Sequence, residues 1–318
     1  MVVQTSVPNA SGLKEAKFEL VQVGEQFGPL EETVTDHKVK SFAFTVDDYS
    51  PWYFGESPFG GRIGHPALLA NDLLMLYLTK YDPTTIMGLH THEEVWFHNP
   101  VFVGETVSLQ ARYVDKYVRR DKGYVVTEAE ARGQDGRLLL RRRGTEILRV
   151  QPGSVVGRHT DEVKSRRVSG DYDRTLAFAP RARADLPIGT PVAPLTKQLH
   201  QDQVSIFSRI DQFFLNIHTD LESARGAGLE TTIAQGEMSV VFLSEMLTNF
   251  FGPSWLTSGW LSAKFIHPTY TGKTVTVSAV VTDRVEEAAG LRLELECWVK
   301  DDGDQMTVVG WASGLVGR

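Results

Sequence analysis

The segment NIHTD, residues 216–220, places the imidazole of His218 between the amide of Asn216 and the carboxylate of Asp220. A histidine beside such groups can take a proton from water or return one to a substrate. Further along the chain, Gly236 opens a long apolar run. The first N–H groups of a helix have no partner within it, and the helix dipole helps them to stabilise developing negative charge. The region therefore combines a proton-transfer group with a potential oxyanion donor.

A second group of chemistry-bearing residues, His90, His92 and Glu93, lies in LHTHEEVWFH. Side chains at i and i+2 of a strand share a face, so His90 and His92 could converge on a metal. No third ligand is evident in the sequence, and we expect no metal and no other cofactor. The chain has no Walker loop, dinucleotide glycine pattern or G-x-S-x-G elbow. Its single cysteine, Cys297, excludes an internal disulfide and should be buried in a strand.

The elements that must position these residues occur twice in the chain. FHNPVFVGETVSLQARYVD from Phe97 matches FIHPTYTGKTVTVSAVVTD from Phe265 at an offset of 168 residues. RIGHPALLANDLLMLYL from Arg62 parallels TIAQGEMSVVFLSEMLT from Thr232 at an offset of 170 residues. A repeat of this length indicates a duplicated domain, because solenoid units are only about 20–50 residues long. We expect an N-terminal domain over residues 1–152, a linker over 153–187 and a C-terminal domain over 188–318.

Each copy predicts a long apolar helix followed by long antiparallel strands. The helices should begin near Pro66 and Gly236 and be wrapped by other elements, because apolar residues cover most of their surfaces. The alternating patterns predict half-buried strands over residues 106–117, 123–133, 137–150, 274–286, 291–300 and 306–316. Asp-Gly pairs at 135–136 and 302–303 predict hairpin turns. The fold class is therefore α+β.

Composition limits the class of protein. Lys and Arg number 33 against 40 Asp and Glu, so the positive charge that nucleic acid binding requires is missing. No apolar stretch is as long as the roughly 18 residues that a membrane-spanning helix needs. The N-terminus also lacks the pattern of a signal peptide. With its one cysteine, the chain fits a reducing compartment. We therefore expect a cytoplasmic protein that binds neither nucleic acid nor a membrane.

The segment NIHTDLESARGAGLETTIAQGEMS, residues 216–239, resembles the active-site region of the MaoC-like hydratases and dehydratases, which include the (R)-specific enoyl-CoA hydratases. The resemblance lies in the order His218, Asp220, Ala224, Gly228 and Gly236 before a long helix. It implies a tandem (double) hotdog fold, in which each half is an antiparallel sheet wrapped around a central helix. It also implies a hydro-lyase that adds or removes water at the double bond of an α,β-unsaturated acyl thioester, with acyl-CoA as the expected partner.

The resemblance assigns the chemistry to the second half. His218 would act as the general base or acid, and the Gly236 N–H would stabilise the enolate oxygen. The sequence departs from the family run Asp-x-Asn-Pro-x-His, because Phe213 stands where the catalytic carboxylate is expected. Asp211, two residues earlier, could replace that carboxylate, or Asn216 could hold the water together with His218. Asp220 is a further candidate, with a helix-capping role as the alternative.

The first half lacks this motif, and the resemblance implies that it binds substrate. Trp52 and Tyr53 stand where the second half has NIH, so Tyr53 takes the place of His218. His65 aligns with Gln235 at the helix start, and both are expected to face one cleft. The alternatives are core packing for the aromatic residues and a turn-capping role for His65.

Three other functions stay open on the sequence alone. Hotdog proteins also include acyl thioesterases, and Phe213 in place of a carboxylate would suit a non-catalytic acyl-binding subunit. The altered motif would equally suit a specialised dehydratase acting on an atypical substrate. A duplicated hotdog supplies its own paired interface, so the chain is expected to be a monomeric pseudo-dimer or a homo-oligomer of double hotdogs.

Overall fold

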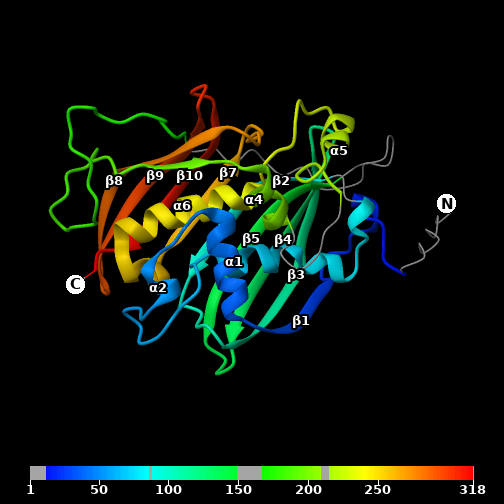
Figure 1. Ribbon diagram of the computed structural model, residues 1–318, viewed down its shortest axis with the longest axis horizontal. Coiled ribbons are helices and arrows are strands. Elements are labelled where there is room, and N and C mark those ends of the chain that lie inside the picture. The colour runs from blue at the N-terminus through cyan, green and yellow to red at the C-terminus, as the bar shows by residue number, and fades with distance from the viewer. Residues whose placement is uncertain (1–11, 86–87, 149–166, 209–214, 318) are drawn as a thin grey trace.

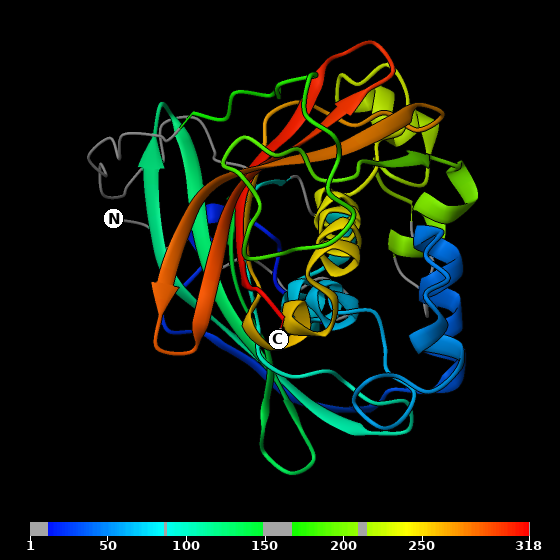
Figure 2. The ribbon, with the colours of Figure 1, turned by 90° about the vertical axis from the view of Figure 1, so that its left-hand side faces the viewer.

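The computed structural model describes residues 12–85, 88–148, 167–208 and 215–317. Its strands form one antiparallel sheet with the order β1-β3-β4-β5-β2-β7-β10-β9-β8-β6. The sheet curves around the central helices, which lie side by side in its concave side (Figures 1 and 2). This arrangement confirms the α+β class.

The strands divide equally between the two halves of the chain. Those of the first half are β1 (Gln26–Thr33), β2 (Leu89–Phe97), β3 (Thr106–Arg119), β4 (Lys122–Gly133) and β5 (Leu138–Leu148). Those of the second half are β6 (Leu195–Gln198), β7 (Trp260–Phe265), β8 (Thr274–Glu287), β9 (Gly290–Asp301) and β10 (Met306–Leu315). The six strands predicted from alternation are all present, with ends within two residues of those expected.

Helices connect and fill the two halves. The α-helices are α1 (Asp36–Val46), α2 (Pro51–Phe54), α3 (Leu68–Met75), α4 (Gln201–Ser208), α5 (Leu221–Gly226), α6 (Gly236–Phe251) and α7 (Trp255–Ser258). Short 3-10 helices are η1 (Phe18–Leu20), η2 (Leu76–Thr79), η3 (Pro83–Thr85) and η4 (Gly252–Ser254). Among the described residues, no helix has the length and apolar character needed to cross a membrane.

The strand order makes the duplication visible. β3 and β8 each have 14 residues, and β4 and β9 each have 12, at equivalent places on either side of the sheet. The halves meet where β2 pairs antiparallel with β7, with Trp96 opposite Trp260. Because the sheet continues through this pair, the two copies are joined by backbone hydrogen bonds as well as by packing.

The two central helices differ in length. α6 runs for 16 residues, and nearly all of them, including Glu237 and Glu245, are buried. The corresponding helix of the first half, predicted to be long, ends as α3 at Met75 and continues only as the 3-10 turn η2. The chain then approaches Pro83, which cannot continue a helix. The prediction of a long central helix was therefore wrong for the first half.

The predicted turns and the buried cysteine can be checked individually. Gly136 has a φ of 81° in the β4–β5 hairpin, as the Asp-Gly pair predicted. In the β9–β10 hairpin the residue with positive φ is Asp304, at 62°, and not Gly303. Cys297 is fully buried in β9, which confirms its predicted position.

The described part of the predicted linker runs along the second half. It has no helix or strand between residues 167 and 187, and the ring of Tyr172 stacks on Trp298 with centroids 6.4 Å apart. Residues 153–166 of that prediction lie outside the described residues.

Candidate active site

A cavity of about 280 Å³ lies beside the N-terminal end of α6. Both halves of the chain build it, because β2, β5 and the end of α3 meet the segments around α6 and β7 there. The described residues that line it are Leu74, Met75, Tyr77, Gly88, Leu89, His90, Thr91, Glu146, Leu148, Ile217, His218, Ile233, Ala234, Gln235, Gly236, Glu237, Phe265, Ile266, His267, Pro268, Thr269 and Val308. The structure thus brings together three predicted residues, His218, Gln235 and Gly236.

Asn216 organises the turn that carries His218. Its Oδ1 accepts a hydrogen bond of 2.8 Å from the backbone N–H of His218, and its Nδ2 donates to Ser208 Oγ at 3.0 Å. Asp220 caps α5, since its Oδ2 accepts from the N–H and the hydroxyl of Ser223 at 2.7 Å each. Both side chains therefore fix local backbone. Asp211 lies outside the described residues.

The tautomer of His218 follows from its partner. Nδ1 lies 2.8 Å from the carbonyl oxygen of Ile233, which can only accept, so Nδ1 carries the hydrogen. Burial lowers the pKa of His218 to about 4, although the bond to Ile233 opposes this shift. The ring is therefore neutral near pH 7, with the lone pair on Nε2. That is the state a general base requires.

The start of α6 leaves its first backbone N–H groups without a side-chain cap. Gln235 is the N-cap residue, but its amide Nε2 instead donates to the carbonyl of Val204 at 3.2 Å. A Cβ on Gly236 would lie 3.1 Å from ring atoms of Phe265, so a larger residue would displace that ring. Glycine therefore lets the start of α6 pack against Phe265 in the cavity wall. The uncapped N–H groups at this helix start favour a negative charge in the cavity.

Glu93 and Arg142 form a fully buried ion pair behind this wall. The Nε and Nη2 atoms of Arg142 donate to Oε1 and Oε2 of Glu93, each at 2.5 Å, and His90 Nε2 donates to Oε2 at 3.0 Å. Burial alone would raise the pKa of Glu93, but Arg142 and His90 lower it to about 2. Burial likewise opposes the charge on His90, yet Glu93 raises the pKa of His90. Glu93 is therefore an anion with three donors.

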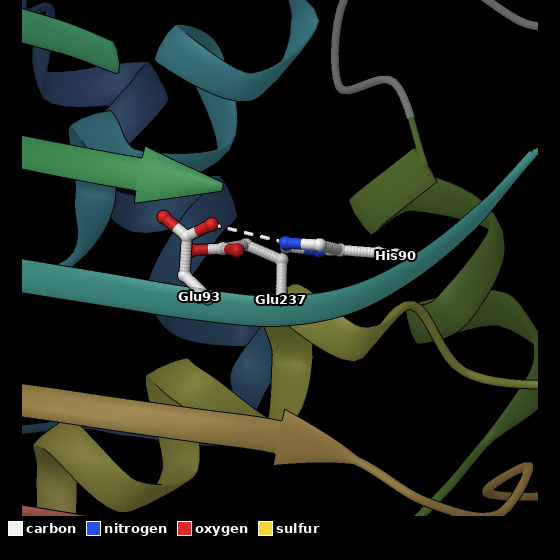
Figure 3. Close-up of side chains that lie close together, drawn as sticks. All are labelled: His90, Glu93 and Glu237. Atoms are coloured by element: carbon white, nitrogen blue, oxygen red, sulfur yellow. Dashed lines mark hydrogen bonds and ion pairs between the residues drawn. The ribbon is translucent and has the colours of Figure 1, made fainter. Parts of the chain in front are cut away.

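Glu237 lies close to this pair without joining it. The ligand-forming atoms of His90, Glu93 and Glu237 all lie within 4.8 Å of one another, and Figure 3 shows the three side chains turned toward each other. Glu237 is fully buried, and among the described residues neither of its carboxylate oxygens has a hydrogen-bond partner. Burial, and then the negative charge of Glu93, raise the pKa of Glu237 to about 7.

These three residues are spaced closely enough to consider a metal. Both oxygens of Glu93 are already used by Arg142 and His90, and the Arg142 guanidinium would repel a second cation beside it. His92 does not join them, because a register shift in the β2–β5 pairing separates it from His90, and its Nε2 lies 2.8 Å from Ser262 Oγ. The donor set therefore fits a proton-transfer cluster better than a metal centre.

Three residues predicted to bind substrate lie elsewhere. Trp52, Tyr53 and His65 are not among the described residues that line the cavity. The Tyr53 hydroxyl donates to Asp48 Oδ2 at 2.8 Å, and His65 Nδ1 accepts from the N–H of Ala67 at 3.0 Å. His65 thus caps a turn, and Trp52 packs against the core.

Nearby, Lys197 Nζ donates to the Asp47 carbonyl at 2.6 Å and to Glu245 Oε1 at 3.0 Å. We call Asp48, Tyr53, His65, Lys197 and Glu245 the Asp48 cluster.

Sequence reasoning missed Glu237 and Glu146. A signal for Glu237 was present, because a carboxylate directly after the predicted oxyanion glycine interrupts an apolar helix that must be buried. Glu146 lines the cavity from β5, and burial raises the pKa of its carboxyl group. Its place could not be read from strand alternation, which does not say which residues meet a distant helix.

Comparison with known proteins agrees with this geometry. Residues 21–142 match the model of the FAS1-like dehydratase domain region, and residues 183–295 match the MaoC-like domain. No curated protein matches the chain.

Three similar solved structures span nearly the whole chain. A MaoC-domain dehydratase from Chloroflexus aurantiacus J-10-fl has 13% identity and a TM-score of 0.74, covering 96% of this chain and 98% of that one. The Mycobacterium tuberculosis protein Rv0216, described as a double hotdog, has 14% identity and a TM-score of 0.68, covering 95% and 98%. A MaoC-like dehydratase from Phytophthora capsici has 14% identity and a TM-score of 0.66, covering 95% and 98%.

These structures define the fold as a double hotdog, which confirms the prediction. The chain thus carries a FAS1-like dehydratase region in its first half and a MaoC-like domain in its second half.

Proposed function

We propose that the cavity beside α6 is the active site of a hydro-lyase that adds or removes water at the double bond of an α,β-unsaturated acyl thioester, such as an acyl-CoA. The observation that carries the proposal is the juxtaposition, in one cavity, of the neutral His218 imidazole and the uncapped start of α6. The first supplies a base for water, and the second supplies N–H groups for an oxyanion.

In the hydration direction His218 Nε2 takes a proton from water as the water oxygen attacks Cβ. The π electrons move toward the thioester oxygen, which the Gly236 N–H stabilises. Asn216 positions His218 by accepting its backbone N–H. Dehydration follows the same path in reverse, with protonated His218 giving its proton to the leaving hydroxyl. A role for Asp211 in holding the water stays a prediction.

The size of the cavity favours a short acyl group. At about 280 Å³ it lies just below the range of about 300–1,000 Å³ that is usual for small-molecule sites. Leu74, Met75, Leu148 and Phe265 supply apolar wall for a few methylene groups. The remainder of a CoA molecule would have to stay outside.

The test is turnover of short-chain trans-2-enoyl-CoA thioesters by the full chain, with enoyl absorbance and free thiol followed in parallel. We expect the absorbance to fall without release of thiol. Release of thiol would instead identify a thioesterase, and tight binding without turnover would identify an acyl-binding subunit. Either of those results would overturn the proposal.

A further inference from the structure

We propose that Glu237 is the second proton-transfer group of this site, exchanging a proton with Cα of the acyl thioester while His218 works on the oxygen at Cβ. This inference rests on the proposed function and adds a residue that the motif around His218 does not contain. Among the buried carboxylates of the described residues, Glu237 is an exception.

Buried carboxylates are normally paired, because an isolated charge in the interior is costly. Glu93 is held by Arg142, and Glu245, on the same helix as Glu237, accepts from Lys197. Glu237 has no such partner among the described residues, although it is fully buried. Because no hydrogen bond of the described residues uses this carboxylate, we assign it a chemical role.

The position of Glu237 suits Cα. It directly follows Gly236, whose N–H is assigned to the thioester oxygen, and both residues line the cavity. Cα is bonded to the carbonyl carbon, so a thioester held at Gly236 brings Cα to the first turn of α6. His218 lines the same cavity from the segment before α5. Two separate elements thus offer one proton-transfer group each.

The charges around Glu237 allow it to hold or release a proton near neutrality. It faces Glu93 and His90 from β2, and Arg142 and Glu146 from β5. Burial and the fixed negative charge of Glu93 raise its pKa to about 7, while Arg142 and His90 oppose the shift. Since both forms are accessible near pH 7, Glu237 can act as acid in hydration and as base in dehydration.

In hydration, His218 accepts one proton of water, a C–O bond forms at Cβ, and the electron pair of the double bond moves toward the thioester. The carboxyl O–H of Glu237 breaks, its proton bonds to Cα, and Glu237 is left as a carboxylate. The proton on His218 then returns to Glu237 through solvent. The net change is addition of one water molecule, without oxidant or reductant.

The test compares Glu237→Gln with Glu245→Gln in the full chain, using the enoyl-CoA that the wild type hydrates best. Glu245 is a matched control, because it is a buried carboxylate on the same helix that does not line the cavity. We expect Glu237→Gln to lower kcat by about 10²–10³-fold and Glu245→Gln to change it less than threefold. Glu237→Asp should restore part of the activity.

The pH profile separates catalysis from a structural role. Wild-type hydration should fall as the pH rises above about 7, because Glu237 then loses the proton that it must donate. This loss of activity at alkaline pH should be absent from the residual activity of Glu237→Gln. The thermal transition of the variant checks that it is folded. Activity of Glu237→Gln within threefold of wild type, or an unchanged loss of activity at alkaline pH, would overturn this inference and leave the proposed function standing. A wild type that hydrates no enoyl thioester would overturn both.

Discussion

The two halves of the molecule differ at the place where the chain enters the central helix of each half. Alignment of the halves sets Tyr53 opposite His218 and His65 opposite Gln235. At the first-half entry Asp48 accepts from the Tyr53 hydroxyl, and beside it Lys197 and Glu245 of the second half pair with each other. In the second half the corresponding region borders a cavity in which Glu237 has no partner among the described residues. The polar side chains are therefore paired at one helix entry, and Glu237 is left without a hydrogen-bond partner among the described residues at the other.

The comparison teaches that burial alone does not distinguish a candidate site from a structural cluster. Glu237 and Glu245 both lie on α6, and burial raises the pKa of each, to about 7 and about 8. The difference is that Lys197 contacts Glu245, whereas Glu237 borders the space that a ligand would fill. We therefore expect substitutions in the Asp48 cluster to affect stability and those in the cavity to affect turnover.

The largest expected effect is on turnover. His218→Ala should lower kcat for hydration by about 10²–10⁴-fold, because it removes the base while the fold persists. Asp48→Asn, in the paired cluster at the first-half helix entry, should leave kcat within threefold and lower the melting temperature. Steady-state rates and thermal melts of both variants check this. Equal loss of turnover in the two variants would remove the distinction between the halves.

The next effect is on stability. Lys197→Met should lower the free energy of unfolding by about 1–3 kcal/mol, because it leaves the buried Glu245 carboxyl and the Asp47 carbonyl without their hydrogen-bond donor. Denaturant titration measures the change. The control is Lys40→Met, which removes an exposed pair with Asp36 and should cost less than about 0.5 kcal/mol. Similar losses of unfolding free energy in both variants would show that the buried pair contributes no more to stability than the exposed pair.

Glu237→Gln should stabilise the protein at alkaline pH. Folding raises the pKa of Glu237 from 4.5 to about 7, so the folded state favours its proton and stability from this group falls as the pH rises between these values. At pH 8 the cost is about 3 kcal/mol, which glutamine avoids. Thermal melts should show the gain at pH 8 and none at pH 4. A gain of equal size at both pH values would contradict the raised pKa.

The smallest effect is expected at the helix start. Gly236→Ala puts a methyl group about 3.1 Å from the ring of Phe265, so the ring must shift within the cavity wall. We expect kcat/KM to fall about tenfold, with the helix intact. Gly226→Ala in α5 is the control, because a Cβ there meets nothing within 4 Å. An unaffected Gly236→Ala enzyme would show that neither this wall nor the helix start needs glycine.

The repeat and the strands could be predicted from the sequence, because they depend on local pattern and on a match between the halves. The grouping of His218 with Gly236 came from the resemblance of residues 216–239 to a known family. The neighbours of Glu237 could not, since His90, Glu93 and Arg142 reach it from two strands whose approach depends on the curvature of the sheet.

The same limit applies to the first half. Alignment placed Tyr53 and His65 opposite residues of the second half, yet their hydrogen bonds to Asp48 and Ala67 hold them outside the cavity. Alignment gives position along the chain, and hydrogen-bond partners decide where a polar side chain turns.

The most direct test of the account is a crystal structure of the full chain with an unreactive acyl-CoA analogue that keeps the thioester carbonyl. We predict that the carbonyl oxygen lies within hydrogen-bond distance of the Gly236 N–H, with Cβ beside His218 Nε2 and Cα beside Glu237. An acyl group bound at the Asp48 cluster, or one whose carbonyl points away from the start of α6, would contradict the assignment of the active site to the second half.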